Sequence, residues 1–190
     1  MKRLNMMRTD LMASQQQSSN TKPSLRDSWQ TPQWLFNWAD ARFNFDIDLA
    51  ASFDNAKVDP YVSIENDSLS GAWNCEDFNC GWVNPPYSET GRWLKKGWEE
   101  ARKGFRSVFL VPAPSGENGY KDYVFGKASE IIFINGRVAF ELPNGDGTAT
   151  PVNGNTRGSC LIIYNRRYEG HTQISWVNRD DMKAEYEVSR

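Results

Sequence analysis

Trp82-Val83-Asn84-Pro85-Pro86-Tyr87 is the stretch around which the rest of the chain is organised. Residues 80–83 predict a buried strand, and the two prolines end it because they fix φ and remove two backbone donors from the ladder. Each residue that precedes a proline is confined to extended geometry. We therefore expect a rigid turn that holds an Asn amide, a proline carbonyl and an aromatic ring at the end of a strand.

The groups on this turn suit a flat molecule that carries an exocyclic amino group. The side-chain oxygen of Asn84 and the backbone carbonyl of Pro85 can each accept one N–H from such an amine. The Tyr87 ring can stack on the face of a base. The predicted catalytic residues are therefore Asn84, Pro85, Pro86 and Tyr87.

Apolar periodicity outside the turn predicts an α/β fold. Residues 33–42, with Thr31 at the N-cap and Pro32 at the first helical position, and residues 88–103 have the spacing of amphipathic helices. Short apolar runs predict further strands at residues 43–51, 61–64, 107–112, 131–134, 138–140 and 161–164. Strands that alternate with helices early and form a hairpin-like run late predict a mostly parallel sheet with an antiparallel edge and helices on both faces.

The turn resembles the catalytic motif of S-adenosylmethionine-dependent amino-methyltransferases, which methylate the N6 of adenine, the N4 of cytosine or a glutamine amide. Taken in order with further stretches between residues 27 and 165, it resembles the phage-type DNA N6-adenine methyltransferase family. Those stretches are Trp29-Gln30-Thr31-Pro32, Phe45 to Ala51, Asn55-Ala56-Lys57, Asp67-Ser68-Leu69 with Trp73, then Trp93, then Gly136 to Phe140. The resemblance implies a Rossmann-like class I methyltransferase fold, S-adenosyl-L-methionine as cofactor and adenine in double-stranded DNA as substrate.

The end of the first expected strand is a predicted cofactor site. Asp48 lies near the carboxyl end of this strand, where doubly wound sheets place ligands, and its carboxylate can accept from the amino group of the methionine moiety. The Gly-x-Gly of most methyltransferases does not follow. Ala50 and its small neighbours stand there instead and allow a close backbone approach.

The resemblance implies three further cofactor contacts. The Thr31-Pro32 turn is expected at the methionine end, the turn around Asn55 at the ribose, and Asp67 near the adenine or ribose. A capped core helix, an ordinary polar loop and an Asx turn remain the alternatives for these three stretches. The full set of predicted cofactor-binding residues is Trp29, Thr31, Pro32, Asp48, Ala50, Asn55, Asp67 and Asn84.

Two long loops, residues 112–129 and 142–159, are where we expect the DNA target to be read, because no domain-sized insert serves that purpose. The target base must leave the duplex stack to reach the catalytic turn. The predicted DNA-binding residues are Lys121, Arg137, Phe140 and Arg157. Phe140 is expected to flank the extruded base and the cations to contact phosphates or base edges, with a structural ion pair as the alternative for Arg137.

Length and charge limit the organisation of the chain. Its 190 residues fit a flexible basic arm over residues 1–26, a methyltransferase domain over residues 27–165 and a partly docked, charged tail over residues 166–190. The formal net charge of −2 gives no global basic signature of a nucleic-acid binder. Contact with DNA therefore has to come from a local patch.

Three cysteines and a single histidine argue against a disulfide framework, a zinc site and a Ser-His-Asp hydrolase. We expect no metal, no membrane association, a bacterial host cytoplasm as the location, and a monomer or homodimer. Other acceptors remain open for the same fold, namely RNA adenine, cytosine N4 or a protein glutamine amide. The absent Gly-x-Gly also leaves open a decayed, non-catalytic DNA-binding module.

Overall fold

The computed structural model describes residues 27–188, apart from residues 28, 64, 65, 74, 75, 145, 147, 153 and 154. The predicted arm, residues 1–26, lies outside the described residues. A six-stranded sheet in the order β1-β2-β3-β7-β4-β8 forms the centre of the molecule. Its strands are β1 (Ile47–Asp48), β2 (Cys80–Val83), β3 (Arg106–Pro112), β4 (Glu130–Asn135), β7 (Ser159–Tyr164) and β8 (Gln173–Asn178).

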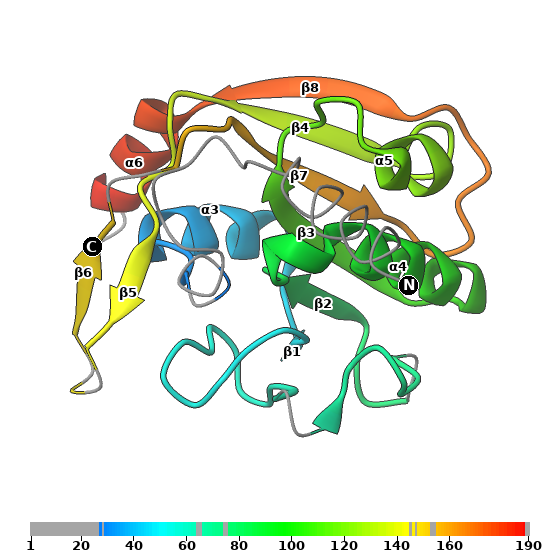
Figure 1. Ribbon diagram of the computed structural model, residues 1–190, viewed down its shortest axis with the longest axis horizontal. Helices are drawn as coiled ribbons and strands as arrows, with labels where there is room; N and C mark the ends of the chain where they lie inside the picture. Colours follow the sequence, from blue (N-terminus) through cyan, green and yellow to red (C-terminus); the bar gives the residue numbers. More distant parts are fainter. Residues whose placement is uncertain are drawn as a thin grey trace, which may run out of the picture.

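A separate two-stranded hairpin stands beside this sheet in Figure 1. It consists of β5 (Glu141–Pro143) and β6 (Ala149–Pro151). The backbone of Gln30 pairs with that of Glu141 in both directions, at 2.9 and 3.1 Å, and ties the hairpin to the chain that leads into the first described helix. This link brings the hairpin close to the segment that carries Trp29.

The sheet is mostly parallel, as predicted, but its antiparallel strand is not at an edge. β1 pairs with β2, β2 with β3, and β4 with β8 in parallel, whereas β7 runs antiparallel between β3 and β4. The predicted antiparallel edge is therefore wrong. Every residue of β7 is buried, which is typical of an interior strand. Apolar runs reveal such strands but do not fix their order.

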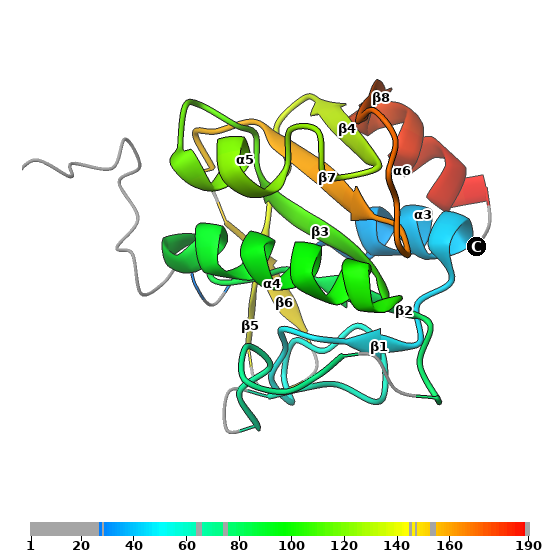
Figure 2. The same ribbon diagram turned by 90° about the vertical axis from the view of Figure 1, so that its right-hand side faces the viewer.

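Helices cover both faces of the sheet, as predicted. Among the described residues these are α3 (Gln33–Phe43), α4 (Thr90–Lys103), α5 (Asn118–Tyr123) and α6 (Arg179–Val188). Figures 1 and 2 show α3 beside α6 on one side of the sheet, and α4 beside α5 on the other. Alternation along β3 supplies both cores, because Val108 and Leu110 face α3 while Phe109 and Val111 face α4.

Close packing of α4 on the sheet depends on a glycine in the middle of the helix. A Cβ at Gly97 would lie 2.5 Å from the Phe109 ring, so a larger residue would push α4 away from β3. Trp93, Leu94 and Ala101 of the same helix are buried against the sheet, in agreement with the predicted apolar stripe. The start of α4, which follows the Asn-Pro-Pro-Tyr turn, is thereby held in place.

Several local expectations need correction. The first strand covers only residues 47–48, residue 61 contributes one isolated bridge, and residues 138–140 form no strand. Pro32 occupies the N-cap of α3 and no side chain caps that helix, so Thr31 is not the cap. The two long loops contain α5 and the β5–β6 hairpin.

The chain forms a further strand after Tyr164, the end of the last predicted strand. β8 pairs with β4, and α6 packs on α3 with Met182 buried. The polar residues Gln173, Ser175 and Asn178 interrupt the apolar residues of this edge strand, and this hides it from a search for apolar runs. Within the described part of the chain, no helix reaches the length and hydrophobicity that a membrane crossing requires.

Candidate functional site

A cavity of about 700 Å³ opens at the carboxyl ends of β1 and β2. Its walls include the loop that follows β1, which lies at the lower edge of the molecule in Figures 1 and 2, and the turn that follows β2. A parallel sheet places its ligands at this edge. The structure brings together six residues of the sequence prediction in this lining: Trp29, Ala50, Asn55, Asp67, Asn84 and Pro86.

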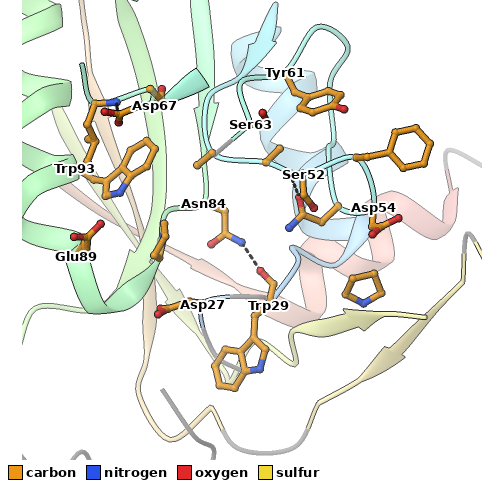
Figure 3. Close-up of a pocket in the computed structure, with 18 residues that line it drawn as sticks. Asp27, Trp29, Ser52, Asp54, Tyr61, Ser63, Asp67, Asn84, Glu89 and Trp93 are labelled. Atoms are coloured by element: carbon orange, nitrogen blue, oxygen red, sulfur yellow. Dashed lines mark hydrogen bonds between the residues drawn. The ribbon is translucent and has the colours of Figure 1, made fainter. Parts of the chain in front are cut away.

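Asn84 is held in a defined orientation between the two sides of the cavity. Figure 3 shows it between Asp67 and Trp93 on one side and Ser52 and Tyr61 on the other. Its Nδ2 donates to the Trp29 carbonyl over 3.0 Å. A carbonyl can only accept, so this bond settles which end of the amide is the NH₂ group. The Asn84 oxygen is left to accept a hydrogen bond from a ligand.

The two prolines and the residues after them form a rigid corner. Pro85 is buried, and among the described residues no donor contacts its carbonyl. The Pro86 carbonyl accepts from the Glu89 amide at 3.0 Å, which closes the short 3₁₀ turn η2 (Tyr87–Glu89). Thr90 Oγ1 donates to the Tyr87 carbonyl at 3.1 Å and joins the turn to α4. Two acceptors therefore belong to adjacent residues, Asn84 and Pro85, on a fixed backbone.

The Tyr87 ring of this corner packs against two further aromatic rings, those of Trp29 and Phe140. Phe140 stacks on Trp29 with ring centres 5.4 Å apart, and Tyr87 meets both rings edge-on at 5.8 and 6.5 Å. Phe140 is fully buried, so it reaches the site through Trp29 rather than by facing a cavity. The Tyr87 hydroxyl is buried and has no partner among the described residues, and burial holds its pKa well above the ordinary value.

Asp48 lies beneath the cavity and holds one of its walls. Only 3% of it is exposed, and its two carboxylate oxygens accept from the amides of Ala50 at 3.2 Å and Lys57 at 3.0 Å. Burial raises the pKa of Asp48 to about 6, against the lowering effect of both amides and of the Lys57 charge. The loop that this carboxylate anchors carries Ala50 and Asn55 into the lining.

The lining is acidic and aromatic. It contains the carboxylates Asp27, Asp54, Asp67 and Glu89, and no lysine or arginine among the described residues that line it. The indole nitrogen of Trp93 is buried beside it and has no hydrogen-bond partner within the described part of the chain. Such a surface favours a cation with an aromatic portion and repels a phosphate. In the described part of the chain, no group of acidic, His or Cys side chains has the arrangement of a metal site.

The sequence prediction does not include part of this lining. Asp27, Glu89 and Trp93 line the cavity, but none of them is among the predicted cofactor-binding residues. A signal existed for Glu89, which follows Tyr87 by two residues and so has to share its corner. Asp27 reaches the site through a contact distant in sequence, since its carboxylate accepts from the Ser88 hydroxyl at 2.9 Å. Thr31 and Pro32 are buried and lie outside the lining.

A second cavity, of about 170 Å³, lies on the other side of the Asn-Pro-Pro-Tyr turn, between the start of α4, the end of β3 and α5. Tyr87, Pro112 and Tyr120 contribute to its lining. At the same cavity, Arg157 Nη1 donates to Glu117 Oε1 at 2.7 Å. The Glu117 carboxyl is partly buried, but hydrogen bonds from Ser115 and Arg157 outweigh burial and lower its pKa to about 2.

The predicted DNA-binding residues do not form one patch. Arg157 lines the second cavity, whereas Phe140 is buried against Trp29 and Tyr87. Lys121 is exposed on α5. Arg137 is exposed after β4, where its carbonyl accepts from Arg179 Nη1 of α6 at 3.1 Å.

Comparisons with known proteins agree in the family they indicate. The sequence model of the DNA N-6-adenine-methyltransferase (Dam) family matches residues 18–188. A DNA N-6-adenine-methyltransferase of Haemophilus phage HP1 (strain HP1c1) is 30% identical over 169 residues, which make up 87% of this chain and 94% of that protein. A DNA N-6-adenine-methyltransferase of Escherichia phage T1 is 29% identical over 171 residues, 82% of this chain and 69% of that protein. The matched region includes both cavities and extends through β8 and α6.

Proposed function

This chain belongs to the DNA N-6-adenine-methyltransferase family, and on that premise we propose that it transfers a methyl group from S-adenosyl-L-methionine to the exocyclic N6 of adenine in double-stranded DNA. The observation that carries the proposal is the orientation of Asn84. Its NH₂ group is bound to the Trp29 carbonyl, so its oxygen is an acceptor at the boundary of the larger cavity. An acceptor in that place suits an amine as the reacting group.

The larger cavity suits this cofactor in size, charge and surface. Its volume lies within the range of about 300–1,000 Å³ that is common for small-molecule sites. S-Adenosylmethionine carries one net positive charge, and the carboxylates of the lining complement it. Asp67, Asn55 and Asp54 are the residues that would hold its hydroxyl and amino groups, and the Trp93 indole nitrogen offers an unused donor.

The second cavity suits the extruded base. It lies against Tyr87, on the other side of the corner from the larger cavity, so a base placed there would lie against the Tyr87 ring, two residues along the chain from Pro85. Arg157, and more distantly Lys121, would then meet the DNA backbone around the extruded nucleotide. Arg137 lies on the α6 side of the molecule and is proposed to contact the duplex farther from the target.

The chemistry follows from the two acceptors. S-Adenosylmethionine supplies a methyl group already activated on a sulfonium centre. Asn84 Oδ1 and the Pro85 carbonyl would each accept one N6 hydrogen, which draws the nitrogen lone pair out of conjugation with the ring and toward the methyl group. After transfer, the nitrogen sheds one proton to water. The residues of this site orient the amine and need no strong base.

Methylation assays with isotopically labelled methyl donor test the proposal directly. We expect label in N6-methyladenine after digestion of double-stranded DNA to nucleosides, and sequencing of the modified sites then gives the recognised word. Parallel reactions with RNA and protein establish the acceptor class. Label in RNA, in cytosine or in glutamine would move the activity to another acceptor, and an absence of cofactor binding by calorimetry would leave a non-catalytic DNA binder. The cytoplasm of a phage-infected bacterial host, where DNA is available, is the proposed place of action.

Substitutions at Tyr87 test the stacking surface. Tyr87→Ala removes a ring whose stacking on a base is worth about 1–3 kcal/mol, so we expect kcat/KM for DNA to fall roughly 5- to 150-fold. Tyr87→Phe is the matched control, because the hydroxyl has no partner among the described residues and the edge-on contacts with Trp29 and Phe140 persist. Equal losses in both variants would assign the role to the hydroxyl and remove it from the ring.

A further inference from the structure

A buried charged cluster joins α4 to a loop far from it in sequence. Glu100 is fully buried, and its carboxylate accepts from Lys96 Nζ at 2.8 Å, from Lys103 Nζ at 2.9 Å and from the Trp73 amide at 3.2 Å. Lys96 Nζ also donates to the Gly71 carbonyl and lies 5.6 Å from the centre of the Trp73 ring. The methyl transfer described above uses none of these groups.

The loop that this cluster holds is a wall of the larger cavity. Trp73 Nε1 donates to the Ser68 carbonyl at 2.8 Å and to the Ser68 hydroxyl at 3.0 Å. Ser68 and its neighbours Asp67 and Leu69 all line the cavity. Trp73 also packs on Trp93, which lines the cavity from α4, with ring centres 6.4 Å apart. A continuous chain of contacts therefore runs from Glu100 to the wall.

The backbone of this wall requires outside support. Asp67 has a φ of 38°, in the left-handed region that non-glycine residues rarely adopt. Its own carboxylate accepts from the Leu69 amide at 3.2 Å, but residues in such conformations persist when the surrounding structure fixes them from several sides. The contacts of Trp73 with Ser68 and with Glu100 supply that support at the far end of the loop.

Stability alone gives a weak reason for this ion pair. Desolvation offsets much of the attraction between buried charges, and apolar residues of similar volume often serve a core equally well. The neighbouring Lys95–Glu99 pair, at 3.7 Å, is half-exposed and forms no hydrogen bond with the described residues of the cavity loops, whereas Lys96–Glu100 is bound to two loop groups. Hydrogen bonds to these two groups fix the position of the loop relative to α4, because they are directional and apolar contacts are not.

We propose that Lys96 and Glu100 are positioning residues for cofactor binding: they fix the loop from Asp67 to Trp73 against α4, so that the Asp67 side of the cavity is formed before the cofactor enters. The inference rests on the proposed function, in which this cavity holds S-adenosylmethionine. Loss of the cluster should raise the dissociation constant for the cofactor and leave the methyl-transfer step intact once the site is filled.

Calorimetric titration of the full chain with S-adenosylmethionine tests this inference. We expect Glu100→Gln to raise the dissociation constant about tenfold or more, because it weakens hydrogen bonds to a charged group. At saturating cofactor its kcat should stay within about threefold of the wild type, which is a KM effect without a kcat effect. Hydrogen exchange at the Trp73 amide should accelerate in this variant.

Glu99→Gln is the matched control, one residue away on the same helix in the exposed pair, and its dissociation constant should equal that of the wild type. Lys96→Met is a second variant that removes the Gly71 contact while Glu100 keeps Lys103 and Trp73 as partners. The inference fails if a folded Glu100→Gln or Lys96→Met protein binds cofactor like the wild type, if kcat falls as much as affinity, or if neither variant folds. A wild-type chain that binds no S-adenosylmethionine would instead refute the proposed function.

Discussion

Asn84→Ala should lower kcat for adenine methylation by about 10²–10³-fold, the usual cost of losing one preorganised polar group at a reacting centre. The Asn84 oxygen would grip N6 as the nitrogen becomes tetrahedral, so its loss should affect the chemical step more than the affinity for DNA or cofactor. Single-turnover methylation with the cofactor saturating measures this step directly. Melting temperature should change little, because the alanine removes one partly buried hydrogen bond to the Trp29 carbonyl.

Asn79→Ala is the matched control for that substitution. Asn79 immediately precedes β2, whereas Asn84 immediately follows it, so the two amides stand at opposite ends of one strand. The Asn79 side chain accepts from Arg166 at 2.8 Å at the surface, outside the cavity. We expect its kcat to match the wild type. Full activity in Asn84→Ala, or an equal loss in both variants, would show that Asn84 does not hold the reacting amine.

Those parts of the site that depend on short stretches of sequence were predictable. The proline corner follows from the conformational limits of two adjacent residues, and its position after a buried strand follows from the apolar run before it. Asp48 and Asn84 could be placed at one edge of the sheet because Asp48 ends one parallel strand and Asn84 directly follows its neighbour. The α4 helix was visible in its spacing of Trp93, Leu94 and Ala101.

Those features that depend on pairing between distant segments were not predictable in the same way. The interior position of β7 is decided by its hydrogen bonds to β3 and β4, and no local pattern encodes them. Asp27 enters the site through Ser88, 61 residues later in the chain. Phe140 shows the converse case, since a residue expected to face the substrate is used to support Trp29 from beneath. A single sequence gives residue types and local geometry, whereas tertiary contacts decide which face each side chain meets.

Asp48 shows how the site and the stability of the fold make opposite demands. Burial raises its pKa from 3.8 to about 6, so the native state takes up a proton at a higher pH than the unfolded chain does. Between these values the native state binds more protons, and the contribution of Asp48 to the free energy of unfolding falls as pH rises from about 4 to 6. By pH 7 the full difference is about 3 kcal/mol, at about 1.36 kcal/mol per pKa unit. The ionised form is nevertheless the one that accepts the amides of Ala50 and Lys57.

Asp48→Asn should therefore weaken cofactor binding and flatten its pH dependence. The variant replaces one acceptor by a donor that opposes a backbone N–H, so we expect the dissociation constant for S-adenosylmethionine at pH 7.5 to rise roughly 10- to 100-fold, as hydrogen bonds to charged groups are worth about 1.5–3 kcal/mol. In the wild type, affinity should fall as pH drops below about 6 and Asp48 gains its proton, whereas the variant should show no such step. DNA affinity without cofactor should change less than cofactor affinity.

Asp46→Asn is the matched control, because it removes the same kind of carboxylate–amide hydrogen bonds at a place outside the cavity. The Asp46 carboxylate also accepts two backbone amides, those of Asn79 at 2.7 Å and Cys80 at 3.0 Å, but at the other end of β1 and away from the cavity. We expect the Asp46→Asn variant to be less stable than the wild type but to bind the cofactor with the same affinity. Unfolding by denaturant at pH 4 and pH 7 completes the test, since the wild type should lose about 2–2.5 kcal/mol relative to Asp48→Asn between these two pH values, most of the full difference. If only DNA affinity changed in Asp48→Asn, the end of β1 would belong to the DNA surface, and the loop it anchors would have no part in holding the methyl donor.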